Sequence, residues 1–102
     1  MGILYITEYA QLAPAGAPGG WGQVPQEPPL AEQKITYSAS VQSAAFNAKT
    51  RMVRIHTDSI CSIEIGTNPT ATTSTGRMVA GQTEYHGVPI GAGYMVAAIT
   101  NT

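Results

Sequence analysis

The chain has 102 residues, a formal net charge of −1, 11% charged residues and a single cysteine. This length fits one domain with one modest core, and the lone Cys61 excludes a small secreted scaffold held by disulfides. The five lysine and arginine residues provide little of the phosphate neutralisation on which nucleic-acid binding depends, so no nucleic-acid partner is expected.

The first predicted element is a strand over residues 2–9, GILYITEY, which is rich in β-branched and aromatic residues. Leu4 and Ile6 fall on one face and Tyr5 on the other, so both faces are expected to be partly covered. No basic segment precedes this apolar stretch, so it is not interpreted as a signal peptide. No apolar run approaches the ~20 residues that span a bilayer, and no membrane partner is expected.

A segment rich in proline and glycine follows at residues 13–29, APAGAPGGWGQVPQEPP. Proline lacks a backbone donor and glycine loses much entropy on ordering, so a contact outside the segment is expected to hold it. Trp21 is a candidate anchor for a partner's pocket; alternatively, the arm folds back and Trp21 caps its own core. We therefore divide the chain into residues 1–33, a strand plus extended arm, and residues 34–102, a folded body.

Alternation of apolar and polar residues predicts strands at 51–58, RMVRIHTD, and 61–66, CSIEIG. The short Asp58-Ser59 turn between them predicts a hairpin. Cys61 falls on the inward-facing side of the second strand and is interpreted as a core residue.

Residues 66–76, GTNPTATTSTG, form a polar loop that is long enough to be functional or to lie on a neighbouring protein. Three further short strands are expected after it: RMVA, TEYHGV and YMVAAIT. Seven or eight short strands without a convincing helix predict an all-β fold, a small antiparallel β-sandwich or barrel.

The sequence offers few residues that could bind a metal or take part in catalysis. His56 with Asp58, and Glu84 with His86, are same-face pairs that would make a metal site only if their strands were neighbours in the right register. The alternative interpretation is a solvated strand face. No nucleophile, base and oxyanion donors come together in the sequence pattern, so no catalytic residue, metal, cofactor or enzymatic activity is expected.

The stretch from Arg51 to Val88, and above all VRIHTDSICSIEIGTNPTAT and RMVAGQTEYHGV, resembles small structural proteins encoded beside the capsid genes of tailed bacteriophages. LYITEY is a weaker match. The resemblance implies a virion decoration or cement protein with a β-sandwich, often jelly-roll-like, that sits on the capsid surface as a homodimer or homotrimer and is assembled in the host cytoplasm. Its partner would be the major capsid protein.

In that interpretation the protein bridges capsid subunits through its arm, and LYITEY adds a strand to a neighbour's sheet. The residues expected to contact a partner are Leu4, Tyr5, Ile6, Trp21, Val24, Pro25, Thr70 and Thr72. Deletion of residues 1–30 is expected to leave a folded body that no longer attaches. A head-to-tail connector or tail component, and a host-attachment or carbohydrate-binding module, are the alternatives.

Overall fold

The computed structural model describes residues 2–14, 21–25 and 27–102, with backbone alone for 13, 14 and 21–24. Every regular element in these ranges is a β-strand, which confirms the all-β class. The strands are β1 (Gly2–Tyr9), β2 (Leu12–Pro14), β3 (Trp21–Pro25), β4 (Ala31–Tyr37), β5 (Val41–Gln42), β6 (Met52–Thr57), β7 (Cys61–Gly66), β8 (Gly76–Met78), β9 (Thr83–Gly87) and β10 (Met95–Thr100).

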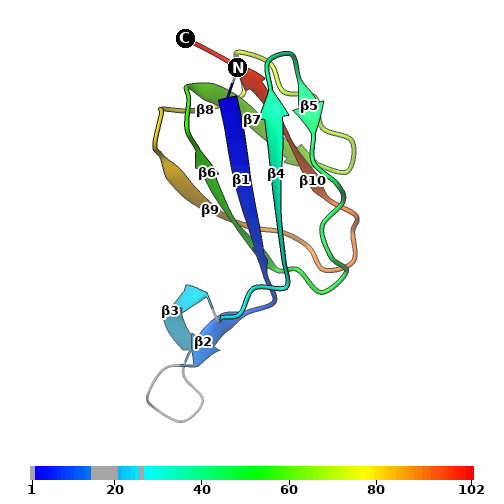
Figure 1. Cartoon of the computed structure of the whole chain (residues 1–102). Helices are drawn as coiled ribbons and strands as arrows, with labels where there is room; N and C mark the ends of the chain where they lie inside the picture. The colour runs from blue at the N-terminus through cyan, green and yellow to red at the C-terminus, as the bar shows by residue number, and fades with distance from the viewer. Residues whose placement is uncertain (1, 15–20, 26) are drawn as a thin grey trace.

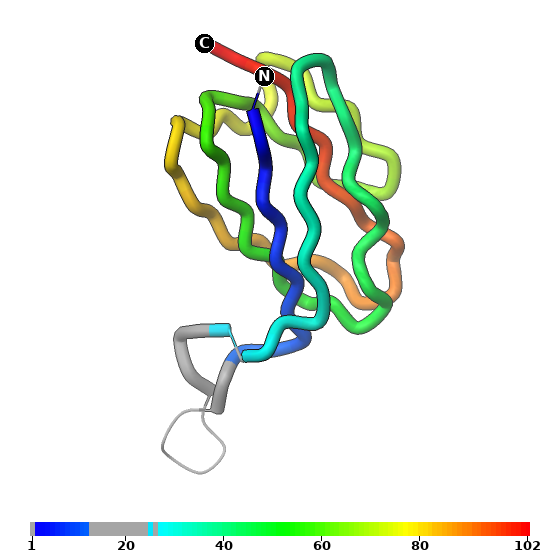
Figure 2. The backbone as a smooth tube through the Cα atoms, in the orientation of Figure 1, coloured from blue at the N-terminus to red at the C-terminus, as the bar shows by residue number. Residues whose placement is uncertain are grey.

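Two four-stranded antiparallel sheets make up the body (Figure 1). The first sheet has the order β4-β1-β6-β9 and the second β5-β10-β7-β8. β2 and β3 form a separate two-stranded hairpin between β1 and β4. This hairpin lies at the end of the body opposite the two chain ends (Figure 1). In the backbone trace, the start of β1 and the end of β10 lie together at that opposite end (Figure 2).

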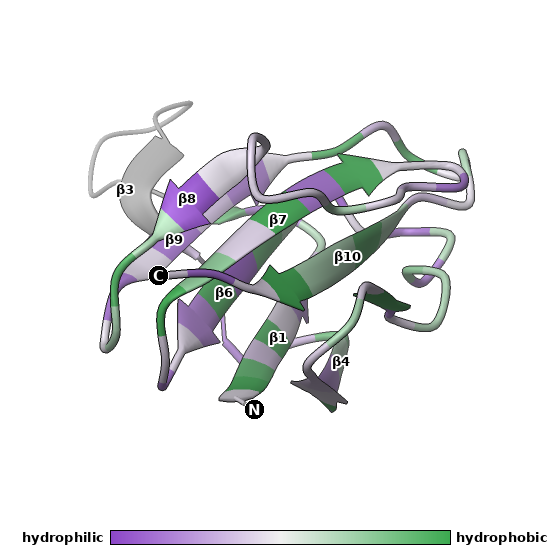
Figure 3. Cartoon of the chain, turned by 90° about the horizontal axis from the view of Figure 1, so that it is seen from above, coloured by the Kyte–Doolittle hydropathy of each residue, from purple (hydrophilic) through white to green (hydrophobic). Residues whose placement is uncertain are grey.

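The core fills the space between the two sheets, and strand alternation determines which side chains enter it. Leu4 and Ile6 of β1 are 0% and 1% exposed, whereas Tyr5 between them is 41% exposed. Apolar bands on β7 and β10 supply the opposite wall (Figure 3). Cys61 is fully buried there, which confirms its interpretation as a core residue.

β1 is a central strand of the body, which corrects the proposed division of the chain at residue 33. It pairs with β4 from Gly2↔Tyr37 to Glu8↔Ala31, and with β6 from Leu4↔Thr57 to Tyr9↔Met52. Its apolar face packs into the core between the two sheets, and the boundary at residue 33 would cut β4. Deletion of residues 1–30 would therefore remove a central strand of a sheet, so the remainder is not expected to fold.

β6 and β7 do not form the predicted hairpin, because they belong to different sheets. Each strand has an apolar face, and the chain brings both faces into one core by crossing between the sheets at residues 58–60. Asp58 fixes this corner: its N–H donates to Ile3 O at 3.2 Å, and its Oδ1 accepts from Ile3 N–H at 2.8 Å. The second bond stabilises the carboxylate and lowers the pKa of Asp58.

A buried hydroxyl group lies beneath the same corner. Tyr37 is 1% exposed, and its Oη lies 2.7 Å from Thr57 Oγ1 and 3.1 Å from Ser59 O, to which it donates. Burial disfavours the phenolate and raises the pKa of Tyr37 to about 12. The Tyr37 side chain thus joins β4 to the sheet crossing, while the backbone of β4 pairs with β1.

The loop between β7 and β8 lies against its own protein. Ala71 is 2% exposed and donates its N–H to Ser40 Oγ at 3.0 Å. Gln42 Nε2 donates to Pro69 O at 2.7 Å, and Asn101 Nδ2 donates to Thr73 O at 3.2 Å. These partners are a residue of β5, the residue directly before β5 and the residue directly after β10, so the loop is held over the second sheet.

Candidate functional site

The structure separates the residues of the predicted LYITEY contact. Leu4 and Ile6 are core residues, so the prediction that they contact a partner is wrong. Tyr5 faces outward on the first sheet, with its ring centroid 6.3 Å from that of His56. Strand addition by β1 is excluded in this fold, since β1 has a neighbour on both sides.

The predicted arm residues belong to the β2–β3 hairpin. Trp21 pairs with Pro14, and Pro25 pairs with Leu12. The side chains of Trp21 and Val24 lie outside the described part of the chain, so their contact with a partner stays a prediction. Pro25 is half-buried in its place beside Leu12.

Thr70 and Thr72 are exposed on the loop over the second sheet. Thr72 O accepts from Thr75 Oγ1 at 2.8 Å, and Thr72 Oγ1 accepts from Ser74 N–H at 3.3 Å, which forms a tight local turn. The two threonines are on this loop, whereas Tyr5 is on the outer face of the first sheet. The predicted contact residues therefore do not form one continuous surface.

The two same-face pairs considered for a metal site do not converge. β6 and β9 are neighbours, but their register places His56 opposite Thr83, with Nδ1 2.8 Å from Oγ1. Glu84 and His86 project from the other face of β9, where Oε1 and Nε2 are 2.9 Å apart. Across residues 2–14, 21–25 and 27–102, no group of three or more potential metal ligands comes together.

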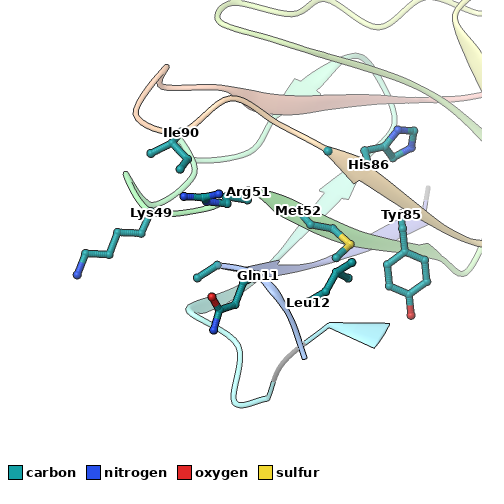
Figure 4. Close-up of a pocket in the computed structure, with 10 residues that line it drawn as sticks. Gln11, Leu12, Lys49, Arg51, Met52, Tyr85, His86 and Ile90 are labelled. Carbon is teal, nitrogen blue, oxygen red and sulfur yellow. The ribbon is translucent and has the colours of Figure 1, made fainter. Parts of the chain in front are cut away.

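A cavity of about 760 Å³ lies where the β2–β3 hairpin leaves the body, and we call it the hairpin-root cavity (Figure 4). Segments far apart in sequence surround it: the start of the hairpin, the loop before β6, the first residue of β6, the end of β9 and the loop after β9. Its large apolar lining residues are Leu12, Met52, Tyr85 and Ile90. Figure 4 shows the first three gathered on one side and Ile90 near Arg51 on the other.

Strand alternation explains why these side chains are available. Met52 and Tyr85 have the opposite parity to the core residues of β6, so they project from the outer face of the first sheet. Tyr85 is 53% exposed and Ile90 is 50% exposed. Large apolar side chains at the rim of a concave surface are typical of a protein contact site.

A buried carboxylate positions the loop before β6. Glu8 is 2% exposed, and its Oε1 accepts from Asn47 N–H at 2.6 Å and from Thr50 Oγ1 at 2.8 Å. Gln33 Nε2 donates to its Oε2 at 3.3 Å. These bonds fix the backbone on both sides of Lys49, next to the cavity.

The base of the hairpin is also held against β1. Tyr9 Oη donates to Glu27 Oε2 at 3.0 Å, and Leu30 N–H donates to Glu8 O at 2.7 Å. Desolvation by burial, followed by the hydrogen bond to the Glu27 carboxylate, raises the pKa of Tyr9. The return of the chain into β4 is therefore tied to the end of β1.

The hairpin-root cavity has a cationic side. Lys49, Arg51 and His86 line it, and none of the six aspartate and glutamate residues does. Within the described part of the chain, the one ion pair is that of His86 with Glu84, so neither Lys49 nor Arg51 has a carboxylate partner there. The cavity therefore combines an apolar lining with positive charge.

Sequence reasoning missed this cavity because its lining comes from separate segments. One feature of the sequence pointed to it: three of the five basic residues, Lys49, Arg51 and Arg54, fall within six consecutive positions.

In the described ranges no helix has the length and apolar character needed to cross a membrane. Comparison of the chain with protein-family models, with curated proteins and with solved structures gives no match.

Proposed function

We propose that this chain is a structural binding protein of a tailed-phage virion, which decorates the capsid surface and holds neighbouring capsid subunits together. The observation that carries the proposal is the end of the molecule where a hairpin leaves a compact β body beside an apolar, cationic cavity. Such an end is suited to contact with another protein. The sequence resemblance described above supports the virion setting.

We also infer that the body is a jelly roll in which the chain begins and ends at an unusual place in the strand order. From β4 to β10 every connection crosses between the sheets except β7 to β8. This order, with β1 between β4 and β6, is that of an eight-stranded jelly roll whose last strand is supplied by the N-terminal segment. Joining the end of β10 to the start of β1 would restore the ordinary connectivity.

Attachment then occurs through the hairpin rather than through β1. Trp21, Val24 and Pro25 belong to the proposed contact, together with the rim of the cavity. The exposed Thr70 and Thr72 lie in the loop over the second sheet and provide a second surface. Two separate surfaces are what a protein needs to bridge neighbouring shell subunits or to pair with copies of itself as a dimer or trimer, and repetition over the shell adds avidity.

A carbohydrate-binding or host-attachment role is the second candidate. It is favoured by Tyr5 and Tyr85, which are exposed on the outer face of the first sheet, two strands apart. Aromatic rings on a sheet face are able to stack on sugars. A place in the neck or tail would use the same contacts in fewer copies.

The test uses particles assembled without this chain, to which the purified protein is added before sedimentation. Full-length protein is expected to co-sediment at a saturating ratio to the shell protein. The matched variant replaces residues 10–29 by Asn-Gly, a two-residue turn that joins β1 to β4 in the observed register. If that variant remains folded and still sediments with full occupancy, attachment through the hairpin is wrong.

A further inference from the structure

β9 forms an open edge of the first sheet. It is the last strand in the order β4-β1-β6-β9, and it lies along the outer side of the body (Figure 1). Its register with β6 runs without a break from His56↔Thr83 to Met52↔Gly87. A regular edge strand of this kind is a template for pairing with another strand.

The backbone groups on the open side of β9 belong to alternate residues. Directly after the strand, Val88 N–H donates to Arg51 O at 2.8 Å, so the backbone of every second residue before Val88 also faces β6. The N–H and C=O groups of Thr83, Tyr85 and Gly87 therefore point away from the sheet. In the part of the chain that the structure describes, no strand pairs with them on that side.

The other edges of the two four-stranded sheets are protected. β5 and β8 have only two and three residues. β4 carries Lys34, and its Gln33 side chain accepts from Ala44 N–H at 3.0 Å and donates to Ala44 O at 3.3 Å. Short length, lysine and a covering loop all hinder an edge from pairing with another chain. β9, with the sequence TEYHG, has five residues and neither lysine nor proline.

The side chains of β9 suit pairing with a second β9 in one register. When two copies run antiparallel with Tyr85 opposite Tyr85, Thr83 lies opposite Gly87, and all the outward-pointing backbone groups find partners. Tyr85 is 53% exposed in the single chain, and in this register the rings of the two copies become neighbours on the outer face. Aromatic pairs across neighbouring strands stabilise a sheet.

Charge selects the same register. On the other face of β9, Glu84 of each copy lies opposite His86 of the other copy. Within one chain Glu84 Oε1 and His86 Nε2 are 2.9 Å apart, so carboxylate and imidazole alternate around the twofold axis. A slip of two residues would place Glu84 opposite Glu84, or His86 opposite His86, and would leave part of the edge unpaired. Unlike charges across a strand pair stabilise it and like charges destabilise it.

We propose that β9 pairs with β9 of a second copy of this chain, antiparallel about a twofold axis at Tyr85, which joins two four-stranded sheets into one. The contact is small, so the expected dissociation constant is on the order of 100 µM. The hairpin-root cavity lies at the Gly87 end of β9, so the two hairpins lie toward opposite ends of the joined sheet. This inference deepens the self-pairing in the proposed function, and it rests on that function only for the place where the dimer is used.

Cysteine cross-linking of the purified full-length chain tests the register. Residues opposite each other at a bonded pair have Cα atoms about 5.5 Å apart, a spacing that suits a disulfide. Tyr85→Cys is therefore expected to form a disulfide-linked dimer under mild oxidation with copper phenanthroline, read on non-reducing gels. Thr83→Cys is expected to cross-link at least about tenfold more slowly, since the two copies of residue 83 lie roughly 13 Å apart along the strands. The native Cys61 is buried and does not compete.

Sedimentation velocity measures the association without a cross-link. The native chain is expected to shift from monomer at about 1 µM to mostly dimer at about 1 mM. Tyr85→Pro removes the N–H at the centre of the contact and is expected to stay monomeric; proline fits there because that N–H points away from the sheet. The control Tyr5→Ala removes an exposed tyrosine from the central strand β1 and is expected to associate like the native chain. Circular dichroism checks that both variants fold.

Three results would overturn the proposal: a native chain that stays monomeric at about 1 mM, equal cross-linking of Tyr85→Cys and Thr83→Cys, or a folded Tyr85→Pro that associates like the native chain. Association to a trimer would also contradict it, because a twofold contact closes at two copies. If Tyr85→Pro does not fold, the two cysteine variants decide. The experiments use purified protein and no particles, so their outcome is independent of whether the chain attaches to a capsid.

Discussion

Glu8 is the residue whose replacement tests the packing of the site most sharply. Glu8→Ala removes a buried carboxylate that accepts from Asn47 N–H at 2.6 Å and from Thr50 Oγ1 at 2.8 Å. Thr50 is 1% exposed, so water cannot readily replace the lost acceptor. Hydrogen bonds to a charged group contribute about 1.5–3 kcal/mol each, so the expected loss of unfolding free energy is about 3–5 kcal/mol.

Urea unfolding followed by circular dichroism measures this loss, with Glu32→Ala as the matched control. Glu32 is an exposed residue of β4 with no hydrogen bond from its side chain in the described part of the chain. Its replacement is expected to change stability by less than about 0.5 kcal/mol. If Glu8→Ala and Glu32→Ala lowered stability equally, Glu8 would not hold the loop before β6 as described.

Three further predictions concern the corner where the chain crosses between the sheets. Gly2→Ala is expected to destabilise by about 1–3 kcal/mol, because an added Cβ would lie 2.5 Å from Tyr37 Oη. The control Gly66→Ala adds a Cβ with nothing within 4 Å, and equal melting temperatures for the two variants would contradict this. Folding raises the pKa of Tyr37 from 10.0 to about 12, so its contribution is complete below pH 10 and is lost as the pH rises toward 12. Urea unfolding across this range should show a loss that is smaller in Tyr37→Phe, and an unchanged loss would refute the assignment. Folding lowers the pKa of Asp58 below 3.8, so its contribution is present above that pH and is lost as the pH falls through the lowered pKa. Acid titration of Asp58→Asn should lack that part of the loss, and a curve identical to that of the native chain would count against the Ile3 hydrogen bond.

Local periodicity predicted the longer strands of the body, because alternation depends on neighbouring residues alone, whereas the β2–β3 hairpin was not predicted in the segment rich in proline and glycine. The inward parity of Val53 and Ile55 in β6, and of Cys61 and Ile63 in β7, was readable from the sequence and is observed. Periodicity does not show which strands pair with each other in a sheet. A short turn suits a hairpin and a crossing between two sheets equally well, and the bonds from Asp58 to Ile3, 55 residues away, decide between them.

The same limit explains the errors at the N-terminus and the missed cavity. Leu4 and Ile6 mark an apolar face, but a buried face in a partner and a buried face in the chain's own core have the same pattern. The cavity depends on the meeting of Leu12, Arg51 and Tyr85, which belong to three distant segments. Because the apolar face of β1 is buried in the chain's own core, the proposed attachment uses the hairpin that follows β1.

We propose above that the chain is a repeated structural component of a virion. The most direct measurement is its copy number in purified particles, determined by quantitative mass spectrometry against the major capsid protein. A number in the hundreds, in constant ratio to the shell protein, is the predicted result. A few copies per particle would place it in the neck or tail, and complete absence from the particles would contradict the proposed function.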